Sequence, residues 1–182
     1  MLSILKILSL IFLVFPLYGQ EIYKSTDVTT RFYSSAPIED IAAQADDGLS
    51  LWNTRTGEIS FRVNIRSFQF EKGKMQEHFN ENFMESRKYP HATFKGEIRN
   101  QPDLSQEGSH QVTLVGILEI HGVKKNREVP AEIRNQGENL NLESEFEVAV
   151  ADHDIEIPKI LWRNIAEEVR VTLRANYSKL DP

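Results

Sequence analysis

Along most of the chain, apolar and polar residues alternate one by one. The alternation is clearest between residues 59 and 65, where the sequence ISFRVNI places an apolar side chain at every second position. A period of two puts these side chains on one face of a β-strand and the polar ones on the other. Similar short segments, separated by turn residues, follow at 92–98, 112–121, 127–133, 140–150 and 169–177. Such a series of amphipathic strands at hairpin spacing predicts an antiparallel all-β domain and excludes a doubly wound α/β fold.

A change of parity after Ile65 favours a closed barrel over a sandwich. Up to Ile65 the apolar side chains are at odd-numbered positions, and after it they are at the even-numbered positions of Phe68 and Phe70. Such a slip of one residue within a strand predicts a β-bulge that bends the sheet. Further strands are expected at 28–34 and 49–53, with a helical or irregular stretch between them at 37–45. We therefore predict an antiparallel β-barrel of about eight strands.

One segment has a different period. Met75, Phe79 and Phe83 recur at i, i+4 and i+8, which is the spacing of an amphipathic helix. The Tyr89-Pro90 pair then forces an extended conformation. The pattern predicts one short helix over about 74–86, placed so that its apolar face covers one end of the barrel.

The composition excludes several classes of site. The chain of 182 residues has 21 Lys and Arg against 27 Asp and Glu, a formal net charge of −6. This balance argues against nucleic acid or an anionic membrane surface as a partner. Without cysteine, disulfides, thiol nucleophiles and iron–sulfur clusters are excluded. The chain also lacks a G-x-S-x-G elbow and a glycine-rich phosphate loop, so we expect neither an enzyme nor a dependence on a cofactor.

The first 19 residues are typical of a secretory signal peptide. Lys6 precedes an apolar run from Ile7 to Leu17, and about 11 residues is too short to span a bilayer comfortably. The small residue Gly19 predicts cleavage before Gln20, which leaves a single domain over 20–182. We expect a periplasmic or secreted protein without stable insertion of the mature chain into a membrane. An uncleaved N-terminal anchor is the alternative.

Several short motifs, taken together and in order, resemble the YceI-like family of exported bacterial proteins. The motifs are Ser67-Phe68, MQEHF at 75–79, FMES at 83–86, Tyr89-Pro90 with ATF at 92–94, LEIHGVK at 118–124, Ile157-Pro158 and Glu168-Val169. The wording MQEHFNENFMES is most similar to versions from Bacteroidetes. The resemblance implies a lipocalin-like β-barrel that holds a long amphiphilic lipid of the polyisoprenoid, prenyl quinone or polyprenyl phosphate class.

In such a barrel, the inward side chains of the strands and of the helix would line the lumen. The candidates are Phe61, Val63, Phe68, Phe83, Phe94, Leu114, Leu118, Ile120, Phe146, Val148, Val171 and Leu173. Three polar residues are candidates for contact with the lipid head group, namely His78, His121 and Lys124. Lys124 and Lys125 together would favour an anionic head group, by charge alone.

Two other interpretations stay open on the sequence. The same apolar side chains could fill a solid core, which would leave a stress-associated structural protein that acts through its surface. His121 and the Asp152-His153-Asp154 group could instead converge at one end of the barrel and hold a metal. Residues in such turns more often cap backbone groups, and we expect no metal. A homodimer is compatible with this sequence.

Overall fold

The computed structural model describes residues 22–35, 40–137, 139–157 and 166–180, so the predicted signal peptide lies outside the described residues. The strands are β1 (Ile22–Ser34), β2 (Ile41–Asn53), β3 (Glu58–Asn64), β4 (Gln69–Phe70), β5 (His91–Arg99), β6 (Gly108–Ile120), β7 (Val123–Gln136), β8 (Asn139–Ala149) and β9 (Glu168–Lys179). The helical elements are η1 (Ile65–Ser67), α1 (Gly73–His78), η2 (Phe79–Phe83) and η3 (Val150–His153).

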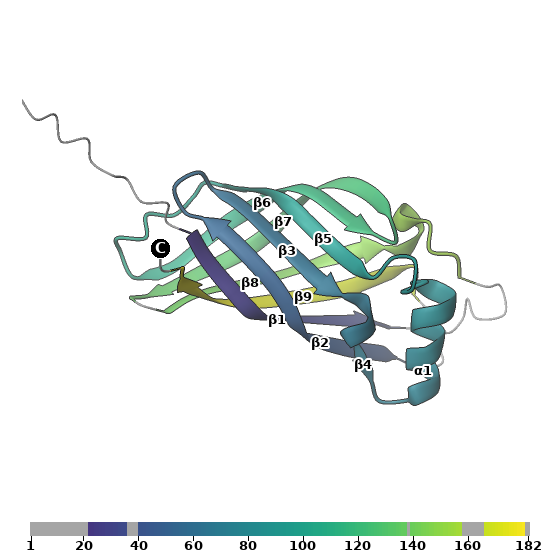
Figure 1. Ribbon diagram of the computed structural model, residues 1–182. Helices are drawn as coiled ribbons and strands as arrows, with labels where there is room; N and C mark the ends of the chain where they lie inside the picture. Colours follow the sequence, from purple (N-terminus) through teal and green to yellow (C-terminus); the bar gives the residue numbers. More distant parts are fainter. Residues whose placement is uncertain (1–21, 36–39, 138, 158–165, 181–182) are drawn as a thin grey trace, which may run out of the picture.

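The strands form one closed antiparallel barrel (Figure 1). From β3 the order runs through β5, β6, β7, β8 and β9, and β9 then pairs with β1. The sheet closes because β1 also pairs with β2, whose other edge meets β3. The two-residue strand β4 pairs with β2 outside this ring. The prediction of an antiparallel barrel of about eight strands with one short helix is therefore confirmed.

The predicted helix changes its winding midway. It begins as the α-helix α1 and continues as the π-helix η2, in which the backbone N–H of Met84 donates to the oxygen of Phe79 at 2.8 Å. The helix lies at one end of the barrel (Figure 1). We refer to this end as the helix end, and to the opposite one as the packed end.

The expected bulge after Ile65 is wrong. Ile65–Ser67 forms one turn of 3-10 helix, η1, which ends β3. Asn64 caps this turn, because its Oδ1 accepts a hydrogen bond from the backbone N–H of Arg66 at 3.1 Å. The change of parity marks a turn between two strands because Phe68 and Phe70 belong to the next segment.

The expected helical or irregular stretch is wrong over residues 41–45, which are the first part of β2. The bulge lies here: Val28 of β1 pairs with Gly48 of β2, whereas Thr30 pairs with Ala45. The inward side of β2 therefore changes parity at residues 46 and 47. This change, together with small inward side chains, hides the alternation of the strand in the sequence.

The half of the barrel at the packed end is filled by side chains. Trp52 is 0% exposed and Leu142 is 1% exposed. Tyr177 reaches the hydroxyl of Ser50 at 2.5 Å, and Ser50 itself donates to the oxygen of Ser60 at 2.9 Å. Burial raises the pKa of Tyr177 above its ordinary value, so this phenol stays neutral and donates to Ser50. A solid core therefore exists in this half of the barrel.

Two glycines bring β5 and β6 unusually close together. Gly96 pairs with Gly116, and a Cβ atom on Gly116 would lie 2.3 Å from the carbonyl oxygen of Lys95. A Cβ atom on Gly96 would lie 2.2 Å from the oxygen of Val115. A glycine within a strand often marks such a close approach of another backbone.

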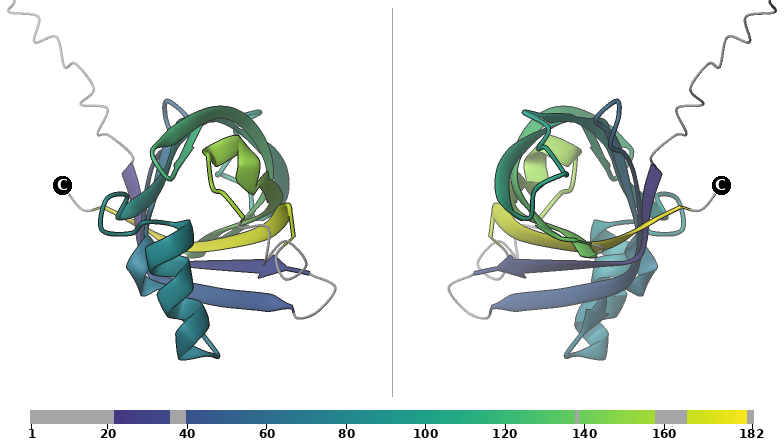
Figure 2. Two further views of the ribbon diagram at one scale, coloured as in Figure 1. Left: turned by 90° about the vertical axis from the view of Figure 1, so that its right-hand side faces the viewer. Right: turned by 90° about the vertical axis from the view of Figure 1, so that its left-hand side faces the viewer.

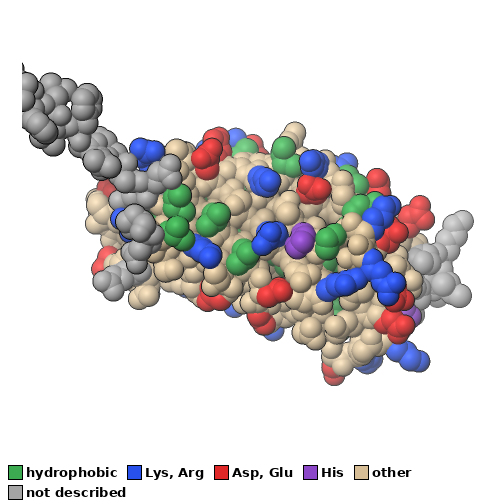
Figure 3. All heavy atoms as spheres, viewed as in Figure 1, with side chains coloured by type: hydrophobic (Ala, Val, Ile, Leu, Met, Phe, Trp, Pro, Cys, Tyr) green, Lys and Arg blue, Asp and Glu red, His purple; other side chains and the backbone are tan. Residues whose placement is uncertain are grey.

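The outer face of the barrel is polar and carries charges of both signs. Lys and Arg side chains are interspersed with Asp and Glu across one face (Figure 3). Some form ion pairs, such as Arg174 with Glu143 of the neighbouring strand at 2.7 Å, and Arg99 of β5 with Glu128 of β7, across β6, at 3.0 Å. None of the helices in the described ranges is long and apolar enough to cross a membrane.

Candidate functional site

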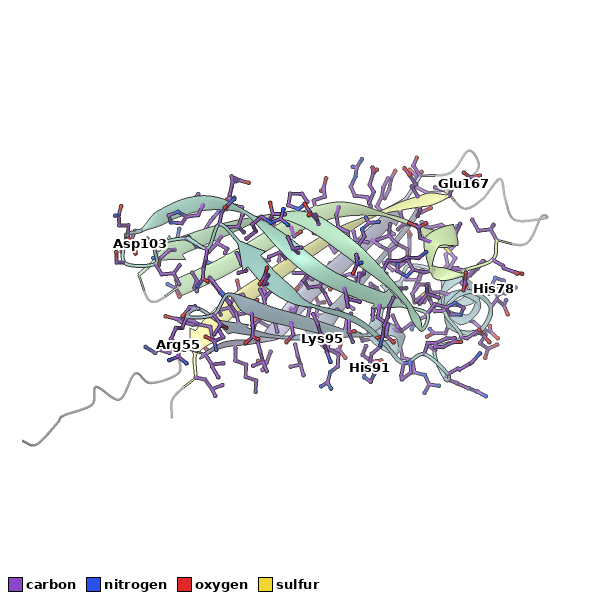
Figure 4. The ribbon with its side chains drawn as sticks, turned by 90° about the horizontal axis from the view of Figure 1, so that it is seen from above. Arg55, His78, His91, Lys95, Asp103 and Glu167 are labelled. Atoms are coloured by element: carbon purple, nitrogen blue, oxygen red, sulfur yellow. The ribbon has the colours of Figure 1, made fainter. Side chains whose placement is uncertain are left out.

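A cavity of about 310 Å³ occupies the helix end of the barrel. Most of its wall comes from six barrel strands, β1, β3, β5, β6, β8 and β9. Ile41 of β2, Phe70 of β4 and residues of α1, η2 and η3 complete it. Figure 2 (left) looks onto this end, with η3 across the opening and α1 beside it. His78 and Glu167 label the same end in Figure 4, and Arg55 and Asp103 label the packed end.

The lining of the cavity is almost entirely apolar. In the described part of the chain, His78 is the one titratable residue among those that line it. Ile120, Phe146 and Val171 point inward and are only half-buried because their side chains face the cavity. The lining therefore offers contact surface for hydrocarbon rather than for a charged group.

The cavity ends on a layer of side chains that we call the floor. Each of the six barrel strands of the wall contributes to the floor the lining residue that lies farthest from the helix end. These residues are Thr30, Phe61, Phe94, Leu118, Phe146 and Leu173. Strand register fixes this layer, because Phe61 pairs with Phe94 and Phe94 with Leu118. Beyond it, the side chains of the packed end meet one another.

A cluster of four phenylalanines attaches the helix to the barrel. The ring of Phe79 in η2 lies 5.5 Å from Phe32, 5.6 Å from Phe68 and 5.0 Å from Phe70, measured between ring centroids. Aromatic pairs at such distances contribute about 0.5–1.5 kcal/mol each beyond the area that they bury. The cluster also explains why the sequence places apolar residues at 68 and 70, outside the barrel strands.

A second segment, residues 150–157, covers the cavity next to the helix. Val150, Ile155 and Ile157 of this segment line the cavity. Its position depends on His153, which is 0% exposed and whose Nδ1 lies 3.2 Å from the carbonyl oxygen of Val123. Burial lowers the pKa of His153, so the ring is neutral and Nδ1–H donates to that oxygen.

His121 links the two covers. Its Nδ1 lies 3.2 Å from the backbone oxygen of His153, and its Nε2 lies 3.0 Å from a carboxylate oxygen of Glu85, just after η2. Glu85, His121 and Asp154 all have positive φ angles, of 41°, 52° and 53°. Such backbone is costly for residues other than glycine and often lies at functional sites. The turn between β6 and β7 therefore holds both covers against the end of the barrel.

Most of the side chains predicted to line the lumen border this cavity. They are Phe61, Val63, Phe68, Phe83, Phe94, Leu118, Ile120, Phe146, Val148, Val171 and Leu173. Leu114 does not, since it is 3% exposed within the packed half. Leu114 and Leu118 lie on the same face of β6, and only their distance from the helix end separates them.

The three head-group candidates lie in different environments. His78 is exposed and borders the cavity at the helix. His121 is not among the lining residues, because its ring is held between Glu85 and His153. Lys124 points outward, with its side chain 66% exposed and 3.7 Å from Glu119. Of the three, only His78 lines the cavity.

Sequence reasoning missed part of the wall of the cavity. Phe32, Phe70, Met84 and Ile155 line the cavity but were not among the lumen candidates. Alternation gives Phe32 a place on an inward face, so the sequence held a signal for it. No periodicity marks Met84 or Ile155, because each belongs to a segment that folds over the barrel end.

A metal site at this end is not supported by the geometry. His121 contacts the backbone of His153 rather than its ring. Within the described ranges, no group of three or more His, Asp or Glu side chains is placed to hold a metal ion.

The profile of the YceI-like domain matches residues 22–177. The chain belongs to the YceI-like family. The match spans the barrel strands, the helix and both covers of the cavity. The resemblance of the motifs is thereby confirmed. No curated protein matches the chain.

Solved structures share this YceI-like fold at low sequence identity. A polyisoprenoid-binding domain from Saccharophagus degradans, implicated in plant cell wall breakdown, is 16% identical, with a TM-score of 0.74 over 89% of this chain and 100% of that one. BcnA from Burkholderia cenocepacia is 13% identical, with a TM-score of 0.70 over 82% and 95%. The YceI protein of Campylobacter jejuni is 16% identical, with a TM-score of 0.55 over 82% and 85%.

Proposed function

We propose that this protein binds a long amphiphilic lipid, with hydrocarbon of the lipid inside the barrel, and that it acts as a carrier or sequestering protein. The observation that carries the proposal is the apolar cavity of about 310 Å³ at the helix end. Barrels of about eight strands have room for either side chains or one small ligand. Here side chains fill the packed half, and the cavity at the helix end leaves room for a ligand.

The size of the cavity indicates how much of the lipid it holds. An apolar protein cavity of about 150 Å³ accepts one benzene ring, so about 310 Å³ corresponds to roughly a dozen carbon atoms. At about 0.8 kcal/mol for each buried CH₂ group, these carbons contribute on the order of 10 kcal/mol before the costs of ordering. A longer chain leaves its remaining part outside, past the two covers.

We assign the ligand to the polyisoprenoid class, which includes prenyl quinones and polyprenyl phosphates. The Saccharophagus degradans domain, described as polyisoprenoid-binding, supports this assignment through its similar fold. The part of the ligand inside the cavity is uncharged, because the lining offers no permanently charged side chain among the described residues. A charged group of the ligand would have to lie outside, near His78.

The lipid would be met in the periplasm or outside the cell. The N-terminal sequence supports this location, with its short apolar run after Lys6. Sequencing the N-terminus of the protein isolated from its own host tests this part of the proposal. A start at Gln20 supports export with removal of the signal peptide, and a chain that retains Met1 contradicts that removal.

Native mass spectrometry of the protein purified from its own host tests the binding itself. We expect a bound mass, and an isoprenoid lipid in an organic extract of the same sample. A protein that is repeatedly empty, and that takes up no isoprenoid or fatty-acyl lipid offered to it, would contradict the proposal.

Replacing Leu118 by Arg tests the place of binding. Leu118 is 7% exposed and belongs to the floor, so the guanidinium would need the space and the polarity that a hydrocarbon chain excludes. We expect retained lipid to fall at least about tenfold. The control is Ile117→Arg, because Ile117 is 44% exposed on the outer face of the same strand.

A second variant covers the case in which Leu118→Arg does not fold. Val171→Trp adds volume on a side chain that faces the cavity, without adding charge. It should lower lipid retention, while Thr172→Trp on the outer face should not. Retention that is unchanged in Val171→Trp would refute binding at this place.

A further inference from the structure

One hydroxyl group in the floor has no hydrogen-bond partner. Thr30 is 7% exposed and lines the cavity, and its Oγ1 is buried without a partner. Four other side chains in the described ranges also have such an atom, namely Trp52, Asn80, His110 and His153. None of these four lines the cavity. Thr30 therefore combines an unsatisfied polar atom with direct contact to the space where the ligand would lie.

The neighbours of Thr30 make this hydroxyl unexpected. Thr30 pairs with Leu173 on one side and with Ala45 on the other, and the remaining floor residues are Phe or Leu. Valine has nearly the same shape as threonine and would fill the position without a buried polar atom that costs folding free energy. The hydroxyl thus contributes nothing visible to the packing of the barrel.

The position also allows the hydroxyl to reach the cavity. Oγ1 and the methyl group of a threonine exchange places by rotation about the Cα–Cβ bond, between staggered positions. Oγ1 is shielded in the present rotamer, while the residue as a whole contacts the cavity. A bound group that offers a hydrogen bond would favour the rotamer that presents Oγ1.

We propose that Thr30 is a specificity-determining residue, which forms a hydrogen bond to a neutral oxygen at the inner end of the ligand. The oxygen belongs to a hydroxyl or carbonyl group, since Thr30 can both donate and accept. A charged phosphate does not fit this position, because the floor offers one hydroxyl and no cation. The proposal rests on the proposed function and narrows it: the ligand enters with a neutral oxygen first, and the hydrocarbon follows toward the covers.

The size of the cavity agrees with this orientation. The cavity has room for roughly a dozen carbon atoms, and a ring or short chain that bears one oxygen fills about half of it. The rest accommodates the beginning of the hydrocarbon chain, whose length is then unrestricted beyond the covers. An inward-pointing hydrocarbon end would leave the Thr30 hydroxyl unsatisfied in the complex as well.

The test compares 1-dodecanol with dodecane on the delipidated protein and on Thr30→Val. Affinities are measured by displacement of the neutral fluorescent probe N-phenyl-1-naphthylamine. We expect Thr30→Val to weaken dodecanol binding by about two- to twelvefold, the range that one net hydrogen bond supplies. Dodecane binding should change by less than about twofold. Thr29→Val is the matched control, because Thr29 is the adjacent residue and bonds Asp46 on the outside.

A stability measurement separates this role from a structural one. Without ligand, Thr30→Val should melt at the same temperature as the unchanged protein or higher, because it removes an unsatisfied polar group. A lower melting temperature with both probes weakened equally would show that the hydroxyl serves the fold, and would overturn the proposal. So would equal dodecanol binding by both proteins. If neither probe binds to the unchanged protein, the proposed function fails, and the role of Thr30 fails with it.

Discussion

At the scale of single residues, polar groups buried at the helix end are tied to the closure of the cavity. His153 is the clearest case, because it is 0% exposed and donates from Nδ1 to the oxygen of Val123, while its Nε2 finds no hydrogen-bond partner among the described residues. The backbone oxygen of His153 in turn lies 3.2 Å from Nδ1 of His121. A change in the protonation of this ring would therefore disturb both the turn between β6 and β7 and the segment over the cavity.

The lowered pKa of His153 predicts a loss of stability in mild acid. Below an ordinary histidine pKa of about 6.5, the unfolded chain takes up a proton that the folded chain does not, so the free energy of unfolding falls as the pH falls. The lowered pKa values of Asp27, Asp103 and Glu132 affect stability mainly below about pH 5. Urea unfolding at pH 7, 6 and 5 isolates the histidine effect.

His153→Gln should flatten this pH dependence. His91→Gln is the control, because His91 is exposed on the side of the barrel (Figure 4). If His153→Gln keeps the full decrease between pH 7 and pH 5, the effect belongs to another group. Stability that rises toward pH 5 in the unchanged protein would contradict the neutral state of His153.

At the scale of elements, the pairing of β5 and β6 depends on two residues without side chains. Gly116→Ala would place a Cβ atom 2.3 Å from the oxygen of Lys95, so the strands would have to separate. We expect a loss of about 2 kcal/mol or more in the free energy of unfolding, or failure to fold. Gly73→Ala is the control, because a Cβ atom there meets nothing within 4 Å. Equal melting temperatures for the two variants would contradict the close approach.

The same scale shows what the sequence could predict about the elements. Alternation identified the inward face of most barrel strands, because the pleat of a strand imposes it. It failed at residues 41–45, where a bulge changes the parity of β2, and at residues 65–67, where one helical turn ends a strand. In both places the backbone leaves the regular ladder, so a pattern based on regular geometry cannot describe it.

At the scale of the whole molecule, the barrel divides into a packed half and a hollow half. Leu142 and Phe146 lie on the same face of β8, with Leu142 fully buried and Phe146 half-buried against the cavity. Leu142→Ala should lower the free energy of unfolding by about 2–5 kcal/mol. Phe146→Ala should cost less, although it removes more atoms, because fewer protein atoms surround the ring. Urea unfolding of the delipidated variants compares the two, and a larger cost for Phe146→Ala would show that this half is packed as well.

The sequence alone could not predict which half of the barrel is packed and which half is hollow. Leu114 and Leu118 have the same residue type and the same face of β6, and yet one is packed and the other borders the cavity. Which one borders the cavity depends on the inward side chains of the other strands at the same level. That level is set by strand register around the closed sheet, a property of residues distant in sequence. Thr30 was missed for a different reason, because a polar residue is not expected in an apolar wall.

The floor includes Phe61, Phe94 and Leu118 on three paired strands. It would therefore stop every bound lipid at the same depth in the barrel. Lipids that share one buried end but differ in the number of repeating units would be indistinguishable inside the barrel. They would differ only in how far their free ends project past the helix. A downstream acceptor, whether an enzyme or a membrane, would thus sort chain lengths that the barrel itself does not discriminate.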